Sequence, residues 1–150
     1  MEEIRVDNPD PANPPLIVSV VDCVDFPLSF VPFHPPPNSK VIFVFSRGDS
    51  LCNRPSQLNH LTRYLTDELP RILPEHNMEL SFYKAIAVSG YKDWGIKELK
   101  DLIFNIRNAE SNVYLIGKRN SYFLVNFKVK PILVNLPLLH PWRKTLHIRK

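Results

Sequence analysis

Two almost uninterrupted apolar runs constrain most strongly what this chain can fold into. Residues 16–21 and 41–45 are rich in Val, Ile, Leu and Phe, without the alternation of apolar and polar residues that marks a half-exposed strand. Such runs are typical of strands buried on both faces of a parallel sheet. They predict strands at 16–21 and 40–45, and similar but weaker patterns predict strands at 80–88 and 112–116.

Two segments between these strands have helical periodicity. Residues 55–73 and 94–106 carry apolar or aromatic side chains at intervals near 3.6 residues. The expected buried stripes contain Leu58, Leu61, Tyr64, Leu65 and Leu69 in the first segment and Ile96, Leu99, Leu102, Ile103 and Ile106 in the second. Strands that alternate with helices predict an α/β fold, with an open, mostly parallel sheet and flanking helices.

The grouping of the prolines along the sequence suggests how the chain is divided. The sequence holds 15 prolines in 150 residues, grouped near residues 9–15, 32–37 and beyond 131. We expect an extended, proline-rich arm at 1–15, one domain at 16–126, and a basic, proline-containing tail at 127–150. No internal repeat is visible.

Composition narrows the class of protein. Hydrophobic content of 44% and charged content of 23% are those of a globular chain, and no apolar stretch is long enough for a membrane span. The amino-terminal residues are acidic and predict no signal or transit peptide. Cys23 and Cys52 have no metal-ligand spacing and the five histidines are scattered, so we expect no metal site.

The carboxyl-terminal part has a distinct charge. From Arg119 onward there are basic residues and no acidic ones, within a net charge of +4 for the whole chain. Such a segment suits the phosphates of nucleic acid or an anionic lipid surface, and a simple solvated tail is the alternative. Trp142, Arg143 and Lys144 are the candidates for stacking on RNA bases and for contacting phosphates.

Polar segments follow each predicted strand. They are 22–25, 46–49, 89–91 and 117–121. In an open parallel sheet, ligands bind outside the carboxyl ends of the strands, so these four segments are the candidate ligand-binding loops. We expect Asp22 and Asp25 to hold loop backbone rather than to work as an acid–base pair, and Trp94 to anchor a loop against the sheet.

In chain order, the motifs in these loops resemble those of a known family. Residues 20–30 read Val-Val-Asp-Cys-Val-Asp-Phe-Pro-Leu-Ser-Phe, residues 46–49 Ser-Arg-Gly-Asp, and residues 87–90 Ala-Val-Ser-Gly, before Trp94-Gly95-Ile96. Residues 112–117 read Asn-Val-Tyr-Leu-Ile-Gly, and 123–126 Phe-Leu-Val-Asn. This order of base-reading boxes before the phosphate box resembles circularly permuted GTPases of the YqeH type.

The resemblance implies a site and a role. It places a guanine-reading loop at Ser46, Arg47 and Asp49, and a second base-side box at Ser89 and Gly90. Its phosphate side is expected at Gly117, Lys118, Asn120 and Ser121. The family acts in assembly of the small ribosomal subunit, with mitochondrial members in fungi, so ribosomal RNA is the implied partner. The resemblance implies a mitochondrial location, and a cytoplasmic one is the alternative.

Two departures from the family pattern bear on activity. A working phosphate loop reads Gly-x-x-x-x-Gly-Lys-Ser/Thr, whereas residues 117–122 read Gly-Lys-Arg-Asn-Ser-Tyr and lack the second Gly and the Lys-Ser pair. No Asp-x-Pro-Gly box is recognisable either. We therefore expect a degenerate member in which GTP or GDP binds weakly or not at all and GTP is not hydrolysed. A functional GTPase and a non-enzymatic protein-interaction module are the alternatives.

Overall fold

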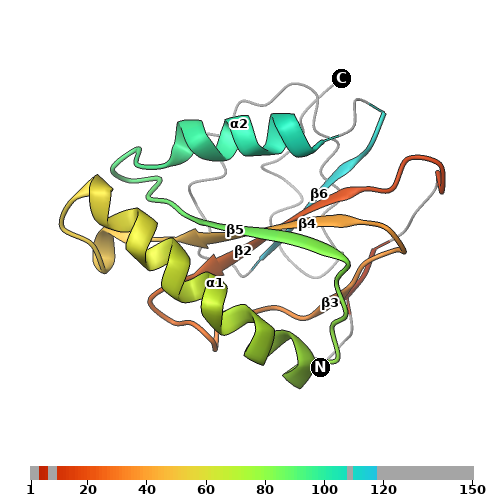
Figure 1. The fold of residues 1–150 in the computed structure, drawn as a ribbon, viewed down its shortest axis with the longest axis horizontal. Coiled ribbons are helices and arrows are strands. Elements are labelled where there is room, and N and C mark those ends of the chain that lie inside the picture. Colours follow the sequence, from red (N-terminus) through yellow and green to blue (C-terminus); the bar gives the residue numbers. More distant parts are fainter. Residues whose placement is uncertain (1–3, 7–9, 108–109, 118–150) are drawn as a thin grey trace, which may run out of the picture.

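The computed structural model describes residues 4–6, 10–107 and 110–117 (Figure 1). They form an α/β fold around a four-stranded sheet in which every pairing is parallel. This confirms the predicted fold class. The sheet consists of β5 (Phe82–Ala87), β4 (Lys40–Ser46), β2 (Leu16–Asp22) and β6 (Val113–Gly117), in that spatial order.

The strand order places a reversal beside β2. From β2 the chain steps outward to β4 and then to β5, and it returns across the sheet to place β6 on the other side of β2. In register, Asp22 pairs with Ser46 and Val20 with Gly117. The carboxyl ends of β2, β4 and β6 therefore lie close together at one edge. A reversal of this kind is where doubly wound folds place their ligands.

Two helices cover opposite faces of the sheet. In Figure 1, α1 (Leu58–Glu75) lies below the sheet and α2 (Ile96–Ile106) above it. The alternation of side chains along each strand produces two cores. One core joins Ile17, Val21 and Phe43 to Leu65 and Leu69 of α1. The other joins Val18, Val20, Ile42 and Val44 to Leu99 and Ile103 of α2.

The helices follow the predicted stripes with one exception. In α2, Leu99 and Ile103 are buried and the other three predicted apolar residues pack partly buried against the same core. In α1 the stripe continues to Ile72 and Leu73, but Tyr64 was wrongly included, because its side chain is 61% exposed. Tyr64 precedes Leu65 and is turned by about 100° away from the buried face.

Local contacts set the ends of α1. A short 3-10 turn, η2 (Pro55–Gln57), leads into the helix, and the Gln57 side chain accepts the N–H groups of Asn53 and Arg54 at 2.7 and 3.0 Å. At the other end, Asn77 takes a positive φ of 54° and Met78 N–H bonds to the Leu73 carbonyl at 2.9 Å. This is the usual way in which a left-handed residue ends a helix.

The proline-rich segment after β2 is more structured than expected. Within it, β3 (Phe33–His34) pairs in parallel with β1 (Ile4–Arg5), so part of the predicted arm is a strand. Phe30 and Phe33 are buried and pack against Phe43 of β4. The segment therefore covers part of the α1 side of the sheet.

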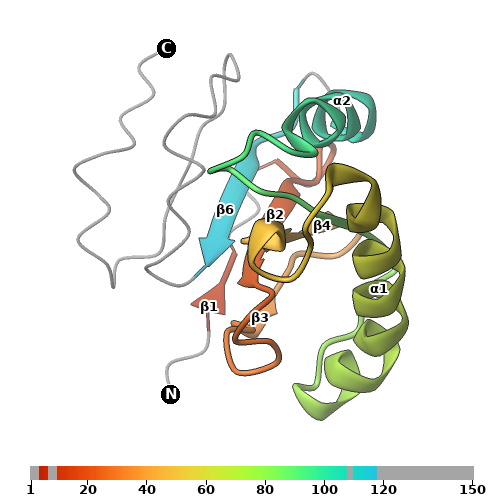
Figure 2. The ribbon, with the colours of Figure 1, turned by 90° about the vertical axis from the view of Figure 1, so that its left-hand side faces the viewer.

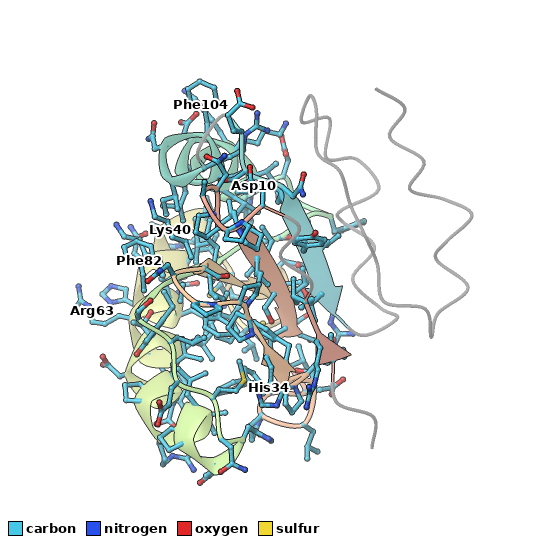
Figure 3. All side chains as sticks on the ribbon, turned by 90° about the vertical axis from the view of Figure 1, so that its right-hand side faces the viewer. Asp10, His34, Lys40, Arg63, Phe82 and Phe104 are labelled. Carbon is cyan, nitrogen blue, oxygen red and sulfur yellow. The ribbon has the colours of Figure 1, made fainter. Side chains whose placement is uncertain are left out.

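At the amino-terminal ends of β4 and β5, side chains of the two strands lie next to the end of α2. Figure 3 shows Lys40 and Phe82 close together there, and Lys40 Nζ lies 5.9 Å from the centre of the Phe82 ring. The same ammonium group is 3.5 Å from the Ile106 carbonyl at the end of α2.

Among the described residues, no helix is both long and apolar enough to span a bilayer.

Candidate functional site

Three loops line the edge where the strands end. They follow β2, β4 and β5, and this edge of the sheet faces the viewer in Figure 2. Because β4 lies between β2 and β5, its loop is the central one. The predicted base-reading segment, residues 46–49, is this central loop.

Backbone contacts pin the central loop to β5. After β4 ends at Ser46, Arg47 adopts a left-handed conformation with φ 60° and ψ 35°. Gly48 then donates its N–H to the Val88 carbonyl at 2.9 Å. A Cβ at position 48 would lie 2.6 Å from Leu58 Cδ2 and 3.0 Å from the Val88 oxygen, so only glycine fits without movement. The short 3-10 helix η1 (Gly48–Ser50) follows and places Asp49 beside β5.

Asp49 is held by Ser89, the second predicted base-side residue. Ser89 is fully buried, and its hydroxyl donates to Asp49 Oδ1 at 2.7 Å. The same hydroxyl accepts the N–H of Lys92 at 3.1 Å, which fixes its direction. Within the part of the chain that the structure describes, Asp49 Oδ2 has no hydrogen-bond partner. The half-buried carboxylate is therefore fixed in place with acceptor capacity left for a ligand.

The turn after Ser89 is closed by a pair of backbone bonds. Ser89 N–H donates to the Trp94 carbonyl at 2.9 Å, and Trp94 N–H donates to the Ser89 carbonyl at 3.0 Å. The Trp94 side chain packs half-buried against the core on the α1 side, which confirms its expected role as an anchor. Gly90 lies inside this turn, next to Ser89.

Asp22 connects the first loop to the central one. Its Oδ2 lies 3.2 Å from Arg47 Nε, and its Oδ1 accepts the N–H of Val24 at 3.0 Å. The expectation that Asp22 holds loop backbone is thus confirmed. The ion pair between Asp22 and Arg47 was not predicted from the sequence. Asp25, in the same loop, is exposed.

The two cysteines near these loops are buried and unpaired. The pKa of Cys23 is raised to about 12, mainly by burial and secondly by the negative charge of the Asp22 carboxylate. Burial also raises the pKa of Cys52. Both thiols stay protonated at neutral pH, which makes them poor nucleophiles. In the described ranges, no three His, Cys, Asp or Glu side chains are grouped so as to hold a metal ion.

The structure thus brings together five of the predicted site residues. Ser46 is the last residue of β4, and Arg47, Asp49, Ser89 and Gly90 lie in the neighbouring loops that follow β4 and β5. Gly117 ends β6 at the same edge, on the far side of β2. The other predicted residues lie outside the described part of the chain: Lys118, Asn120, Ser121, Trp142, Arg143 and Lys144.

A scan against models of known protein families finds no match to this chain, and a search of curated proteins finds none either.

Proposed function

We propose that this chain is a degenerate guanine-nucleotide-binding protein of the circularly permuted GTPase type, which binds guanine nucleotides weakly and does not hydrolyse GTP. One observation carries the proposal. The Asp49 carboxylate, which the sequence resemblance assigns to guanine recognition, is fixed by the buried Ser89 hydroxyl at the carboxyl edge of the parallel sheet.

The chemistry of a fixed carboxylate favours guanine over adenine. Guanine presents two neighbouring donors, its N1–H and its exocyclic amine, which match the two oxygens of one carboxylate. Adenine presents an amine beside an acceptor nitrogen, so one carboxylate oxygen would face a lone pair. A charge-assisted hydrogen bond contributes about 1.5–3 kcal/mol, which is enough for clear discrimination between the bases.

The position of Gly117 supports a ligand longer than a base. Gly117 ends β6 at the same sheet edge as Asp49, with β2 and β4 between them. A nucleotide whose base lies at the end of β4 can extend towards β2 and towards β6, the strand that Gly117 ends. Because the sequence 117–122 lacks the Lys-Ser pair, phosphate binding is expected to be weak and hydrolysis absent.

A titration of thermal unfolding with GDP, GTP and ATP, each with magnesium, tests the proposal. We expect GDP and GTP to raise the melting temperature at concentrations at which ATP has little effect. Equal stabilisation by ATP and GDP contradicts the assignment of Asp49. Phosphate release from GTP that is lost in an Asp49→Ala variant would instead establish a functional GTPase.

By resemblance, we further propose a role in biogenesis of the small ribosomal subunit, in mitochondria, with ribosomal RNA as the partner. The basic residues beyond Gly117 support contact with a polyanion. Binding of purified protein to ribosomal RNA tests this role separately from nucleotide binding.

A second candidate function is that of a protein-interaction module. Each of the three loops at the candidate site exposes at least one large apolar side chain, and the most exposed one in each loop is Leu28 at 81%, Leu51 at 54% and Tyr91 at 86%. Exposed apolar side chains grouped on one edge are typical of contact surfaces. If no nucleotide binds, and replacement of these three residues by Ser abolishes binding to a purified protein partner, this second function is favoured.

A further inference from the structure

We propose that the outer edge of β5 pairs in antiparallel orientation with β5 of a second copy of this chain, so that two four-stranded sheets join into one. The inference goes beyond the proposed function and does not depend on nucleotide binding. It concerns the end of the sheet opposite to β6, and Figure 3 shows Phe82 at this margin of the molecule, with β6 on the other side.

The first step is the direction of the backbone groups of β5. Val88 N–H donates to β4 at 2.9 Å. Ala87 N–H, one residue earlier, points the other way and donates to Thr62 Oγ1 of α1, also at 2.9 Å. Because these groups alternate along a strand, Tyr83 and Ala85 direct their N–H and C=O groups away from β4 as Ala87 does. Among the described residues, this part of the edge has no neighbouring strand.

The second step is the surface beside this edge. Tyr83 and Ala85 pack partly buried against the core on the α1 side, whereas Ile86 packs against the core on the α2 side. The alternation of side chains therefore places Phe82 and Lys84 on the α2 side, where Phe82 is 37% exposed and Lys84 is exposed. An open edge flanked by partly exposed apolar side chains is a template for another strand.

The third step is the register, which decides whether a second copy fits. In an antiparallel pair with two-fold symmetry, the residue on the axis faces its own copy. With Lys84 on the axis, two ammonium groups would face each other, which is unfavourable. With Ala85 on the axis, Tyr83 would have to bond to Ala87, whose N–H is already taken by Thr62. Both of these registers are therefore disfavoured.

With Tyr83 on the axis, neither problem arises. Tyr83 then exchanges backbone hydrogen bonds with its copy, at the part of β5 that lies away from Thr62. Phe82 of each chain faces Lys84 of the other, and an ammonium group is attracted to the face of an aromatic ring. In this register the edge is complementary to itself, which favours a second copy over an unrelated peptide as the occupant.

Sedimentation equilibrium of the full chain, freed of nucleic acid, tests the inference. We expect a reversible dimer with a dissociation constant of about 1–100 µM, because edge pairing buries less area than a standard interface. Hydrogen exchange locates the contact: the amides of Tyr83 and Ala85 should exchange more slowly as protein concentration rises. The Ala87 amide, which is bonded within the chain, should not change.

Charge variants of Phe82 test the register. Phe82→Lys places like charges opposite Lys84 of the second copy and should weaken the dimer at least about tenfold, whereas Phe82→Glu places opposite charges there and should retain it. Ala85→Pro removes an outward N–H and should also weaken the dimer at least about tenfold, since proline is tolerated only at edges that stay unpaired. Phe104→Lys, which changes an 81% exposed aromatic residue of α2, is the matched control and should dimerise as the parent does. Melting temperatures of all variants separate a loss of folding from a loss of pairing.

Three results would overturn the inference. Parent protein that stays monomeric at the highest concentration has no such interface. Equal losses in Phe82→Lys and Phe82→Glu would exclude the register centred on Tyr83, and an equal loss in Phe104→Lys would place the contact on α2. Amides of Tyr83 and Ala85 that are protected only when a different purified protein is added would assign the edge to another partner.

Discussion

At the scale of single residues, Asp49 is the side chain on which ligand selectivity depends. We predict that Asp49→Asn lowers GDP affinity about tenfold or more, because an amide offers one acceptor where guanine needs two. The same variant should gain affinity for xanthosine diphosphate, since xanthine replaces the exocyclic amine by a carbonyl that the amide can bind. Competition binding with GDP and xanthosine diphosphate measures both changes. An unaltered preference for GDP in the variant would remove Asp49 from the site.

Two buried serines differ in a way that predicts opposite effects on stability. Ser19, in the middle of β2, is 1% exposed, and its hydroxyl has no hydrogen-bond partner in the described structure. Ser29 is 4% exposed, and its hydroxyl donates to the Asp22 carbonyl at 2.7 Å. We predict that Ser19→Ala leaves the free energy of unfolding unchanged or raises it by about 1 kcal/mol, whereas Ser29→Ala lowers it by about 1–3 kcal/mol.

Denaturant unfolding of both variants measures the difference, and each serves as the control for the other. Similar losses in the two variants would mean that the Ser19 hydroxyl is paired in the folded protein.

The Cys23 thiol makes a specific contribution to alkaline stability. Burial raises its pKa from 9.0 to about 12 in the folded protein. Because the folded state disfavours the thiolate, this contribution to stability is complete below pH 9 and is lost as pH rises from 9 towards 12. In that window the free energy of unfolding should fall by up to about 1.4 kcal/mol per pH unit on account of this group.

Denaturant unfolding between pH 8 and pH 10.5 checks this prediction, with Cys23→Ala as the comparison. The variant should have the shallower dependence on pH, whatever its stability at pH 8. Parallel curves for the two proteins would show that the thiol is solvated in the folded state.

At the scale of elements, the sequence was most informative where burial is continuous. The apolar runs predicted β2 and β4 to within one residue, and the 3.6-residue period predicted both helices. The two-residue strands β1 and β3 were missed, because strands so short carry no periodic pattern. Their pairing depends on Phe33 entering the core, which is a tertiary contact and not a local preference.

The candidate site was predictable in part for the same reason. Sequence motifs identified Asp49 and Ser89, but their contact follows from the adjacency of β4 and β5, which only the topology supplies. The Asp22–Arg47 ion pair likewise follows from the register of β2 with β4. Parallel neighbours bring strand-end residues together, so a correct strand order would have indicated both pairs in advance.

The turn that begins α2 provides a test at this scale. Gly95 has a φ of 72°, and a Cβ there would lie 3.0 Å from the Ala87 carbonyl and 3.2 Å from Val88 Cγ1. We predict that Gly95→Ala lowers the free energy of unfolding by about 1–3 kcal/mol, since both the backbone conformation and the close contact penalise a side chain. Lys97→Ala, an exposed change in the first turn of α2, is the control and should alter stability by less than about 0.5 kcal/mol.

Denaturant unfolding compares the two variants with the parent. Because Gly95 follows the Ser89–Trp94 pair, the Gly95→Ala variant should also lose affinity for GDP. Full stability in Gly95→Ala would mean that this turn adapts without cost and does not fix Ser89.

At the scale of the whole molecule, charge divides the sequence into two unlike parts. Residues 1–117 hold all 15 acidic residues and 11 of the 19 Lys and Arg, which gives them a net charge of −4. Residues 118–150 hold the other 8 basic residues and no acid, and so carry +8. We therefore expect a polyanion to bind to the residues after Gly117, and we expect residues 1–117 to contribute little to the electrostatic attraction.

The last prediction follows from this division. The part of the sequence after Gly117 should bind ribosomal RNA with an affinity that falls steeply with salt, because each neutralised phosphate releases a counterion. The double variant Arg143→Ala/Lys144→Ala should bind more weakly, and the slope of log affinity against log salt concentration should fall by about two units. If the Trp142 ring stacks on a base, Trp142→Ala should reduce the binding free energy by about 1–3 kcal/mol and leave this slope unchanged. Filter binding at several salt concentrations measures both quantities. Lys97→Ala/Lys100→Ala, which removes two exposed lysines of α2, is the charge-matched control and should bind almost as the parent does. An equal loss in this control would place the RNA contact on the folded domain, and no loss in either double variant would leave the basic residues after Gly117 as a solvated segment.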